Sequence, residues 1–222
     1  MDVVILAGGK GSRMNHVLPK PLMEVAGKPI LTYQLDYLLK SKEINKIILS
    51  IGYKSDEIKK FIDSNSKKYM PSKIEFSVEE QLLGTAGGLN KALPKTNTNY
   101  ILVLNCDDIT DINISKLSKI KENTICVAHP RLPFGLVKEK NNFAFFVEKP
   151  ILDSWVSCGW YLLNRDELLK SLPEKGSLEY DVFPKMKMKL FKHGGFWSTF
   201  NTEKDIREFE EKDLPVVLRN SK

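Results

Sequence analysis

The stretch that most constrains this chain runs from Val3 to Leu22, where a short apolar segment is followed at once by clustered glycines. Val3 to Leu6 form an uninterrupted apolar run, which is typical of a strand buried on both faces in a parallel sheet. Gly8, Gly9 and Gly11 follow, and glycines let the backbone approach a ligand so that several N–H groups point at one anion. The combination predicts a strand that leads into an anion-binding loop, with phosphate as the expected anion.

The side chains of this loop also favour a phosphate ligand. Arg13 is the only arginine among the first 130 residues of a lysine-rich chain, and its planar guanidinium can hold a polyphosphate in a fixed orientation. Lys10 and Lys20 add positive charge, and the prolines on either side of Lys20 favour an extended segment. The loop matches neither G-x-x-x-x-G-K-[ST] nor G-x-G-x-x-G. The remaining alternative, glycines that only make a turn, leaves the clustered cations unexplained.

Composition restricts the class of protein. With 222 residues, 42% of them hydrophobic, the chain can bury one substantial core, and we expect no second full domain. No apolar run approaches the ~20 residues that span a bilayer, and no signal peptide is recognisable, so we expect a cytoplasmic protein without a membrane partner. The net charge of +6 comes from scattered lysines, which predicts no nucleic-acid partner.

Strand-like and helical patterns alternate along the first part of the chain. We predict strands at 46–51, 73–78 and 101–104, and helices beginning at Pro29 and Ser55. Three strand-like runs between residues 124 and 148 lie close together, which predicts antiparallel strands in a layer on the substrate side of the core. The predicted fold class is therefore α/β, with a Rossmann-like mixed, mainly parallel sheet flanked by helices and a small antiparallel substrate-side layer.

Polar side chains follow two of the predicted strands. Glu79 and its polar neighbours precede a glycine-flanked helix start at Gly84, which places them at the carboxyl edge of the sheet, where open α/β sheets bind ligands. An ordinary capped helix is the alternative. Asp107, Asp108 and Asp111 crowd together after the strand at 101–104, and such crowding is costly unless a cation offsets it. Asp107 is the candidate ligand, whereas Asp108 and Asp111 can instead cap a helix starting near residue 112.

These motifs carry a resemblance to a known family. LAGGKGSRM followed by PKPL resembles the signature loop of the sugar-phosphate nucleotidylyltransferases, written G-G-x-G-[ST]-R-[LM] with a downstream P-K-P. Segments similar to the family's LGTAG, N-x-D, E-K-P and G-x-Y follow in order, and the resemblance covers nearly the whole chain. It implies a Mg2+-dependent enzyme that joins an NTP and a sugar 1-phosphate to give an NDP-sugar and pyrophosphate. Compact members that make GDP-heptose or UDP-N-acetylmuramic acid are the most similar in length, and we favour GTP with heptose or mannose 1-phosphate.

The resemblance also assigns roles to residues and to the two halves of a single domain, residues 1–222. The half formed by residues 1–121 would bind the nucleotide and residues 122–222 the sugar phosphate. The implied catalytic residues are Arg13, Lys20 and Asp107, and the implied metal ligands are Asp107 and Asn201. The implied nucleotide-binding residues are Leu6, Ala7, Gly8, Gly9, Lys10, Gly11, Ser12, Glu79, Gly84 and Thr85, and the implied sugar-phosphate residues are Lys149, Ser157, Gly159 and Glu179.

The chain departs from the family pattern at two of these positions. Ser157 stands where an asparagine is usual, which leaves the identity of the sugar open. Relatives carry W-x-D-x-G-T or W-x-x-x-D-T near residue 197, and this chain has Thr199 and Asn201 at the two aspartate positions, so the second charged metal ligand is missing. Glu179 alternatively serves only to start a helix.

Two other functions stay open at this stage. One is a cytidylyltransferase acting on a non-sugar phosphate such as phosphocholine. The other is a non-catalytic nucleotide-binding regulatory subunit, which the missing aspartate favours and the retained Arg13, Lys20, Asp107 and Lys149 disfavour. The expected partners are an NTP and a sugar 1-phosphate, and a homodimer is left open.

Overall fold

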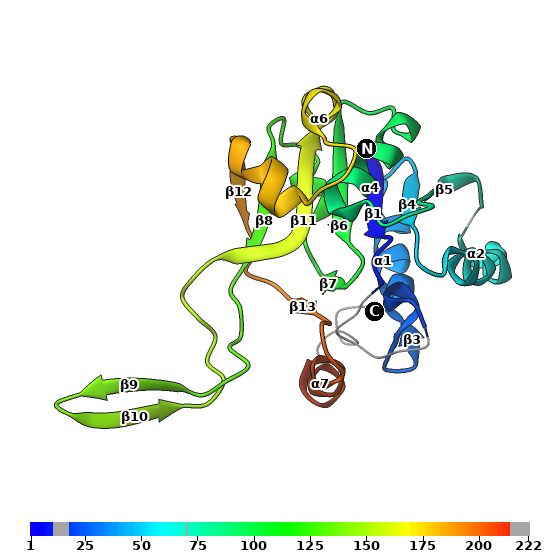
Figure 1. Ribbon diagram of the computed structural model, residues 1–222. Helices are drawn as coiled ribbons and strands as arrows, with labels where there is room; N and C mark the ends of the chain where they lie inside the picture. The colour runs from blue at the N-terminus through cyan, green and yellow to red at the C-terminus, as the bar shows by residue number, and fades with distance from the viewer. Residues whose placement is uncertain (11–17, 70, 214–222) are drawn as a thin grey trace.

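The main sheet of the protein has seven strands, and all but one of them run in the same direction (Figure 1). The computed structural model describes residues 1–10, 18–69 and 71–213. The strand order is β12-β8-β11-β6-β1-β4-β5, and only β11 is antiparallel to its neighbours. The bounds are β1 (Asp2–Ala7), β4 (Ile47–Ile51), β5 (Ile74–Val78), β6 (Tyr100–Asn105), β8 (Thr124–Ala128), β11 (Val156–Asn164) and β12 (Lys189–Lys192). The predicted α/β class with a mainly parallel sheet is confirmed.

Helices cover both faces of this sheet. The α-helices are α1 (Ile30–Leu39), α2 (Ser55–Ser64), α3 (Ser66–Tyr69), α4 (Gly84–Ala92), α5 (Ile114–Leu117), α6 (Arg165–Ser171) and α7 (Glu203–Glu208). Of these, α7 packs in a separate apolar cluster that contains no residue of the main sheet. Single helical turns of 3-10 or π type add Lys20–Leu22, Pro71–Lys73, Leu93–Lys95, Leu178–Val182, Phe183–Lys185 and Phe209–Asp213. The first helix begins one residue after Pro29, and the second begins at Ser55 as predicted.

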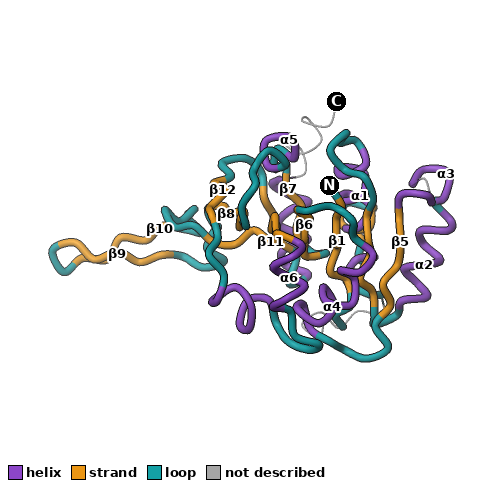
Figure 2. The backbone as a smooth tube through the Cα atoms, turned by 90° about the horizontal axis from the view of Figure 1, so that it is seen from above, coloured by secondary structure: helices purple, strands orange, loops and turns teal. Residues whose placement is uncertain are grey.

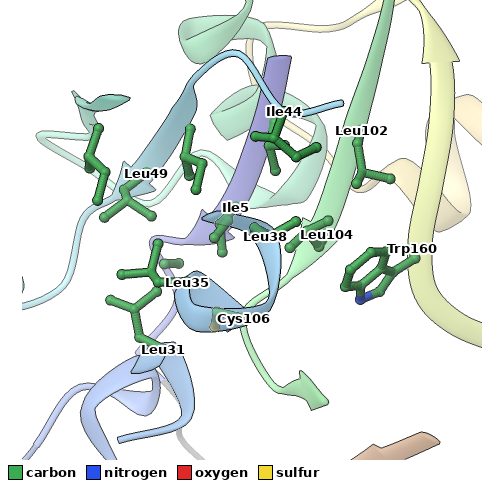
Figure 3. Packing of buried hydrophobic residues seen from close by; sticks show 14 of the residues in the cluster. Ile5, Leu31, Leu35, Leu38, Ile44, Leu49, Leu102, Leu104, Cys106 and Trp160 are labelled. Atoms are coloured by element: carbon green, nitrogen blue, oxygen red, sulfur yellow. The ribbon is translucent and has the colours of Figure 1, made fainter. Parts of the chain in front are cut away.

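The alternation of side chains along β1 explains why the sheet needs cover on both faces. Val3 and Ile5 point into one apolar cluster with α1 and α2, and Figure 3 shows Leu31, Leu35 and Leu38 of α1 against Ile5. Val4 points to the opposite face, into a second cluster with α4 and α6. All three β1 residues are completely buried, as the uninterrupted apolar run predicts for a central parallel strand.

The strands predicted between residues 124 and 148 do not form a single layer. The apolar, buried β8 joins the main sheet beside β11, whereas β9 (Leu136–Lys140) and β10 (Phe143–Val147) form a separate antiparallel hairpin. Figures 1 and 2 both show this hairpin extending away from the body of the protein. The strand-like runs predicted the strands correctly but not their pairing, because β9 and β10 form a sheet of their own in which every residue of β10 is exposed.

Two further pairs of short strands complete the described structure. β2 (Glu24–Val25) pairs with β3 (Lys28–Pro29), and β7 (Asp108–Thr110) pairs with β13 (Trp197–Thr199). The second pair places the segment after β6 beside the chain leading to α7, although the two are about ninety residues apart in sequence. Among the described residues, no helix is long and apolar enough to cross a membrane.

Candidate active site

The carboxyl ends of the parallel strands β1, β4 and β5 meet around one cavity. Its volume is about 450 Å³, and it is lined by Lys10, Gly52, Tyr53, Glu79, Glu80, Gln81, Leu82 and Lys175. Because these strands are parallel, the loops that follow them share one edge of the sheet, which is where α/β sheets bind ligands. Lys10 and Glu79 were predicted from the sequence to bind a nucleotide, and the structure places both at this cavity.

Glu79 lies beneath the glycine loop with its carboxylate engaged. Its Oε1 accepts a hydrogen bond from Ser50 Oγ at 3.2 Å, and its Oε2 accepts one from the Leu83 amide at 3.2 Å. A methyl group at Gly8 would collide with this carboxylate, and one at Gly88 would come within 2.7 Å of it. The glycines are therefore required because the Glu79 carboxylate fills the space between Gly8 in the loop after β1 and Gly88 in the helix α4.

The other residues predicted to contact the nucleotide fall into three groups. Leu6 and Ala7 end β1 and point their side chains toward opposite apolar clusters, so only their backbone can serve a ligand. Gly9 and Lys10 are exposed. Gly11, Ser12 and Arg13 lie outside the described residues.

Gly84 and Thr85 start α4 and contact the segment predicted to bind the sugar. Thr85 Oγ1 donates to Glu179 Oε2 at 3.0 Å and accepts the Leu178 amide at 2.8 Å. Gly84 has a φ of +76°, and a side chain there would collide with the Gly176 carbonyl. The structure thus brings a predicted nucleotide residue into direct contact with a predicted sugar residue.

Lys20, Asp107 and Asn201 converge from three distant parts of the sequence. The Lys20 ammonium forms an ion pair with Asp107 Oδ2 and donates to Asn201 Oδ1 at 3.4 Å. Both charged side chains are about one-sixth exposed, so the pair faces solvent only in part. The Asp107 carbonyl accepts the Phe200 amide at 3.0 Å, which ties the two segments together beside the site.

The oxygen atoms around the Lys20 ammonium suit a hard divalent cation as well. Asp107 Oδ2 and Asn201 Oδ1 both contact one positive charge, and Mg2+ prefers oxygen ligands, keeps several waters and shares its site with substrate phosphates. Within the described ranges, no group of three or more histidine, cysteine, aspartate or glutamate side chains is placed to hold a metal. The pair therefore fits a Mg2+ that depends on nucleotide phosphates for its remaining ligands.

The two other carboxylates of the acidic segment do not take the capping roles considered for them. The cap of α5 is Asn113, whose side chain accepts the Lys116 amide at 2.9 Å. Asp111 instead accepts the Phe196 amide at 2.7 Å and faces His193 at 2.9 Å. The sequence pattern was misleading here because β7 extends the chain by several residues before the helix begins.

Asp108 is buried beside the site and accepts the Trp197 indole N–H at 2.9 Å. Burial raises the pKa of this carboxyl well above its usual range, and the charge of Asp107 raises it further, although hydrogen bonds from Trp197 and Thr199 oppose the shift. Of the two residues at the family's aspartate positions, Thr199 forms a hydrogen bond with Asp108. Asn201 is the residue that contacts Lys20.

The raised pKa of Asp108 predicts a pH-dependent effect of Asp108→Asn. The folded state holds this proton more tightly than the unfolded state, so the wild-type free energy of unfolding falls as pH rises above the ordinary carboxyl pKa of about 3.9. Asparagine cannot ionise. Denaturant melts of both proteins should show the stability of the variant rising relative to wild type between pH 4 and neutrality; a constant difference across that range would contradict a raised pKa.

The residues predicted to bind the sugar phosphate lie in two places. Ser157 Oγ and Tyr161 Oη are 3.0 Å apart on β11, and Gly159 lies between them with a φ of +72°. Burial raises the pKa of Tyr161, and the negative charge of Glu179, whose carboxylate accepts a hydrogen bond from Thr85, adds to this. Lys149 lies elsewhere, in an ion pair with Glu208 of α7.

Some contributors to this site carried little signal in the sequence. Gln34 looks like part of the apolar stripe of α1, yet its amide donates to the carbonyls of Asn105 and Asp108 at 2.7 and 2.9 Å. A polar residue on an otherwise apolar helix face was the only available sign. Tyr53, Lys175 and Glu208 come from segments without a motif, and only the folded chain places them near the predicted residues.

A mainly parallel sheet whose carboxyl edge gathers a glycine loop, a lysine and a carboxylate is an arrangement typical of α/β proteins that bind phosphorylated ligands. The nucleotidyl transferase family model matches residues 2–198. The chain therefore belongs to the nucleotidyl transferase family.

Two relatives of known name and one solved structure are similar to this chain over most of its length. The chain is 32% identical to the mannose-1-phosphate guanyltransferase of Hypocrea jecorina over 93% of its own length and 62% of that protein, so it spans less than two thirds of that relative. It is 34% identical to the D-glycero-alpha-D-manno-heptose 1-phosphate guanylyltransferase of Campylobacter jejuni, over 81% of this chain and 83% of that one. The structure of HddC from Yersinia pseudotuberculosis complexed with GMP-PN superposes with a TM-score of 0.77 at 27% identity, covering 96% and 99% of the two chains.

Proposed function

We propose that this protein transfers a guanylyl group from GTP to heptose or mannose 1-phosphate, giving a GDP-sugar and pyrophosphate. The observation that carries the proposal is the convergence of Lys20, Asp107 and Asn201 at the carboxyl edge of the sheet, next to the loop after β1. The choice of GTP is supported by the names of the two relatives, which are a mannose-1-phosphate guanyltransferase and a heptose 1-phosphate guanylyltransferase.

The reaction asks little covalent chemistry of the protein, because the attacking phosphate oxygen of the sugar is already ionised. Catalysis then consists of alignment and charge stabilisation. Lys20 would stabilise the negative charge that develops on the α-phosphate, while Arg13 and the loop amides would hold the β- and γ-phosphates. A Mg2+ held by Asp107 and Asn201 would supply further neutralisation of phosphate charge when bound.

The sugar phosphate would bind on the second side of the site. Lys149 has a positive φ of 44°. Its ammonium forms an ion pair with Glu208, and an incoming sugar phosphate would replace the Glu208 carboxylate as the partner of Lys149. The hydroxyl groups of the sugar would be contacted by Ser157, Tyr161 and Glu179. Gly159 would leave space for the sugar between Ser157 and Tyr161, because it has no side chain.

The specificity of the proposal can be tested with a matrix of substrates. Pyrophosphate release would be measured for GTP, ATP, CTP, UTP and dTTP, each with mannose 1-phosphate, a heptose 1-phosphate, N-acetylmuramic acid 1-phosphate and phosphocholine. We expect release with GTP and mannose or heptose 1-phosphate. Release only with CTP and phosphocholine would replace the proposal by the cytidylyltransferase alternative.

Asn201 stands where relatives have a metal-binding aspartate, and this difference favours the alternative of a regulatory, non-catalytic protein. The variant Asn201→Asp tests whether the missing charge weakens metal binding. A second carboxylate would face Asp107 across the cation position, so the variant should bind Mg2+ more tightly, by about tenfold or more on the scale of changes in a ligand environment. The readout is the Mg2+ concentration that gives half-maximal pyrophosphate release. Asn201→Ala is the matched control and should need more Mg2+ than wild type; equal requirements in all three proteins would remove Asn201 from the metal site.

A further inference from the structure

The hairpin formed by β9 and β10, residues 136–147, is called the arm here, and it exposes most of its apolar side chains. Phe143, Phe145 and Phe146 are 72%, 52% and 67% exposed, and Val137 is 60% exposed. No arm residue belongs to the three apolar clusters found among the described residues. An isolated two-stranded hairpin is only marginally stable in water, and exposed aromatic groups mark contact surfaces.

The two chain segments at the base of the arm pair with each other. The Leu132 amide donates to the Pro150 carbonyl at 3.0 Å, and the Leu152 amide donates to the Pro130 carbonyl at 2.9 Å. Both views show the arm extending from these residues into solvent (Figures 1 and 2). Because its two strands and its base are already paired, the arm can present a preformed strand edge to a partner at a reduced cost in conformational entropy.

The two edges of the arm differ in charge. The sequence of β9 is LVKEK, and charged residues, lysine above all, protect an edge strand from further pairing. The sequence of β10 is FAFFV, which has no charge and no proline. The outer edge of β10 is therefore the one suited to accept another strand.

The turn fixes which backbone groups β10 offers outward. Asn141 and Asn142 both have positive φ, 54° and 62°, as a two-residue type I′ turn requires. The residues flanking such a turn, Lys140 and Phe143, form a hydrogen-bonded pair, and pairing alternates from there. The amide and carbonyl groups of Ala144 and Phe146 consequently point away from β9.

We infer that β10 pairs antiparallel with β10 of a second copy of this chain, about a two-fold axis at Phe145. This register joins the outward groups of Ala144 to those of Phe146 in the other copy, so every outward group has a partner. The side chains also match, because each large Phe146 lies beside a small Ala144 and each Phe143 beside a Val147. A second copy supplies this complementarity through symmetry alone.

The proposed pairing also ends growth at two copies. The four-stranded sheet that results has β9 at both outer edges, and each β9 carries Lys138, Glu139 and Lys140. Charged edges oppose the addition of another strand. The uncharged edges of both β10 strands are paired with each other in the dimer. The assembly therefore closes as a two-fold dimer and does not extend into a fibre. This inference is independent of the proposed function.

The oligomeric state of charge variants tests the pairing. Wild type should sediment as a dimer that dissociates on dilution, and Phe145→Lys should be monomeric, because like charges would lie directly opposite each other at the axis. Val137→Lys is the control: it places the same charge on the same arm, but on β9, and should remain dimeric. A wild-type monomer at every concentration, or a dimeric Phe145→Lys, would overturn the inference.

Disulfide trapping tests the register. Phe145 and its copy form a non-hydrogen-bonded pair, whose Cα atoms lie about 4.5 Å apart in antiparallel sheets, within disulfide range. Phe145→Cys should therefore give a covalent dimer under mild oxidation on a non-reducing gel. Val137→Cys would be separated from its copy by three strand spacings, about 14 Å, and should stay uncrosslinked. The native thiols do not interfere, because Cys106, Cys126 and Cys158 are buried and burial raises the pKa of each. Absence of a crosslink in Phe145→Cys would contradict the register.

Discussion

Lys20→Ala should lower kcat at least ~100-fold, the scale for removing one charge-stabilising donor from an active site. Lys20 is the cation that the structure places against both Asp107 and Asn201, and its loss would leave the developing charge on the α-phosphate without that donor. KM for the nucleotide should change less than kcat, because the interaction strengthens in the transition state. Steady-state pyrophosphate release would measure both constants.

A second lysine provides the control for this experiment. Lys46 Nζ pairs with Glu75 Oε1 at 2.9 Å on the outer part of the sheet, away from the candidate site. Lys46→Ala removes a more exposed ion pair and should leave kcat within about twofold of wild type, since exposed pairs contribute little. Equal losses of activity in both variants would mean that Lys20 acts only through folding, and near-wild-type kcat in Lys20→Ala would exclude the proposed role. Arg13→Ala is expected to reduce kcat on the same scale as Lys20→Ala.

Gly159→Ala should lower the free energy of unfolding by about 3 kcal/mol, from the sum of a left-handed backbone and an overpacked contact. Gly159 has a φ of +72°, and an added methyl group would collide with Asp108 Oδ2. Asp108 cannot move aside easily because it is buried and bonded to Trp197. Denaturant unfolding monitored by tryptophan fluorescence would measure the loss.

Two other glycines separate the causes of that loss. Gly27 has the same φ of +72° but nothing within 4 Å of an added methyl, so Gly27→Ala should cost about 1 to 2 kcal/mol from the backbone alone. Gly194 has open space and no positive φ, and Gly194→Ala should be nearly neutral. A Gly159→Ala variant no less stable than Gly27→Ala would show that the contact with Asp108 relaxes.

Local pattern was enough to predict the parallel strands β1, β4, β5 and β6 and two of the loops that follow their carboxyl ends. The apolar run of β1 has one solution, burial on both faces, and the glycines after it had to lie at the carboxyl edge. Lys20 and Asp107 followed from clustered charge at two loops, and parallel strands bring such loops together. Asn201 joined them through the resemblance, and the structure places it beside Lys20.

Long-range pairing was what the pattern could not supply. Asp108, Asp111 and Gln34 owe their positions to β7, β13 and the turn at 193–196, which meet only in the folded chain. The partner of the arm is a second long-range contact that the sequence pattern does not give. The strand-like runs of the arm were recognisable, but the sequence does not say whether an apolar strand is covered by its own chain or by another.

Guanylyl transfer can be measured directly by following the α-phosphate of the nucleotide. The wild-type protein would be incubated with Mg2+, mannose 1-phosphate and GTP labelled at the α-phosphate, and the products separated. We expect labelled GDP-mannose together with unlabelled pyrophosphate in equal amounts, and the same pattern for a heptose 1-phosphate with its GDP-sugar. Label that stays in GTP, or that appears only in GMP or GDP with both sugar phosphates, would contradict guanylyl transfer.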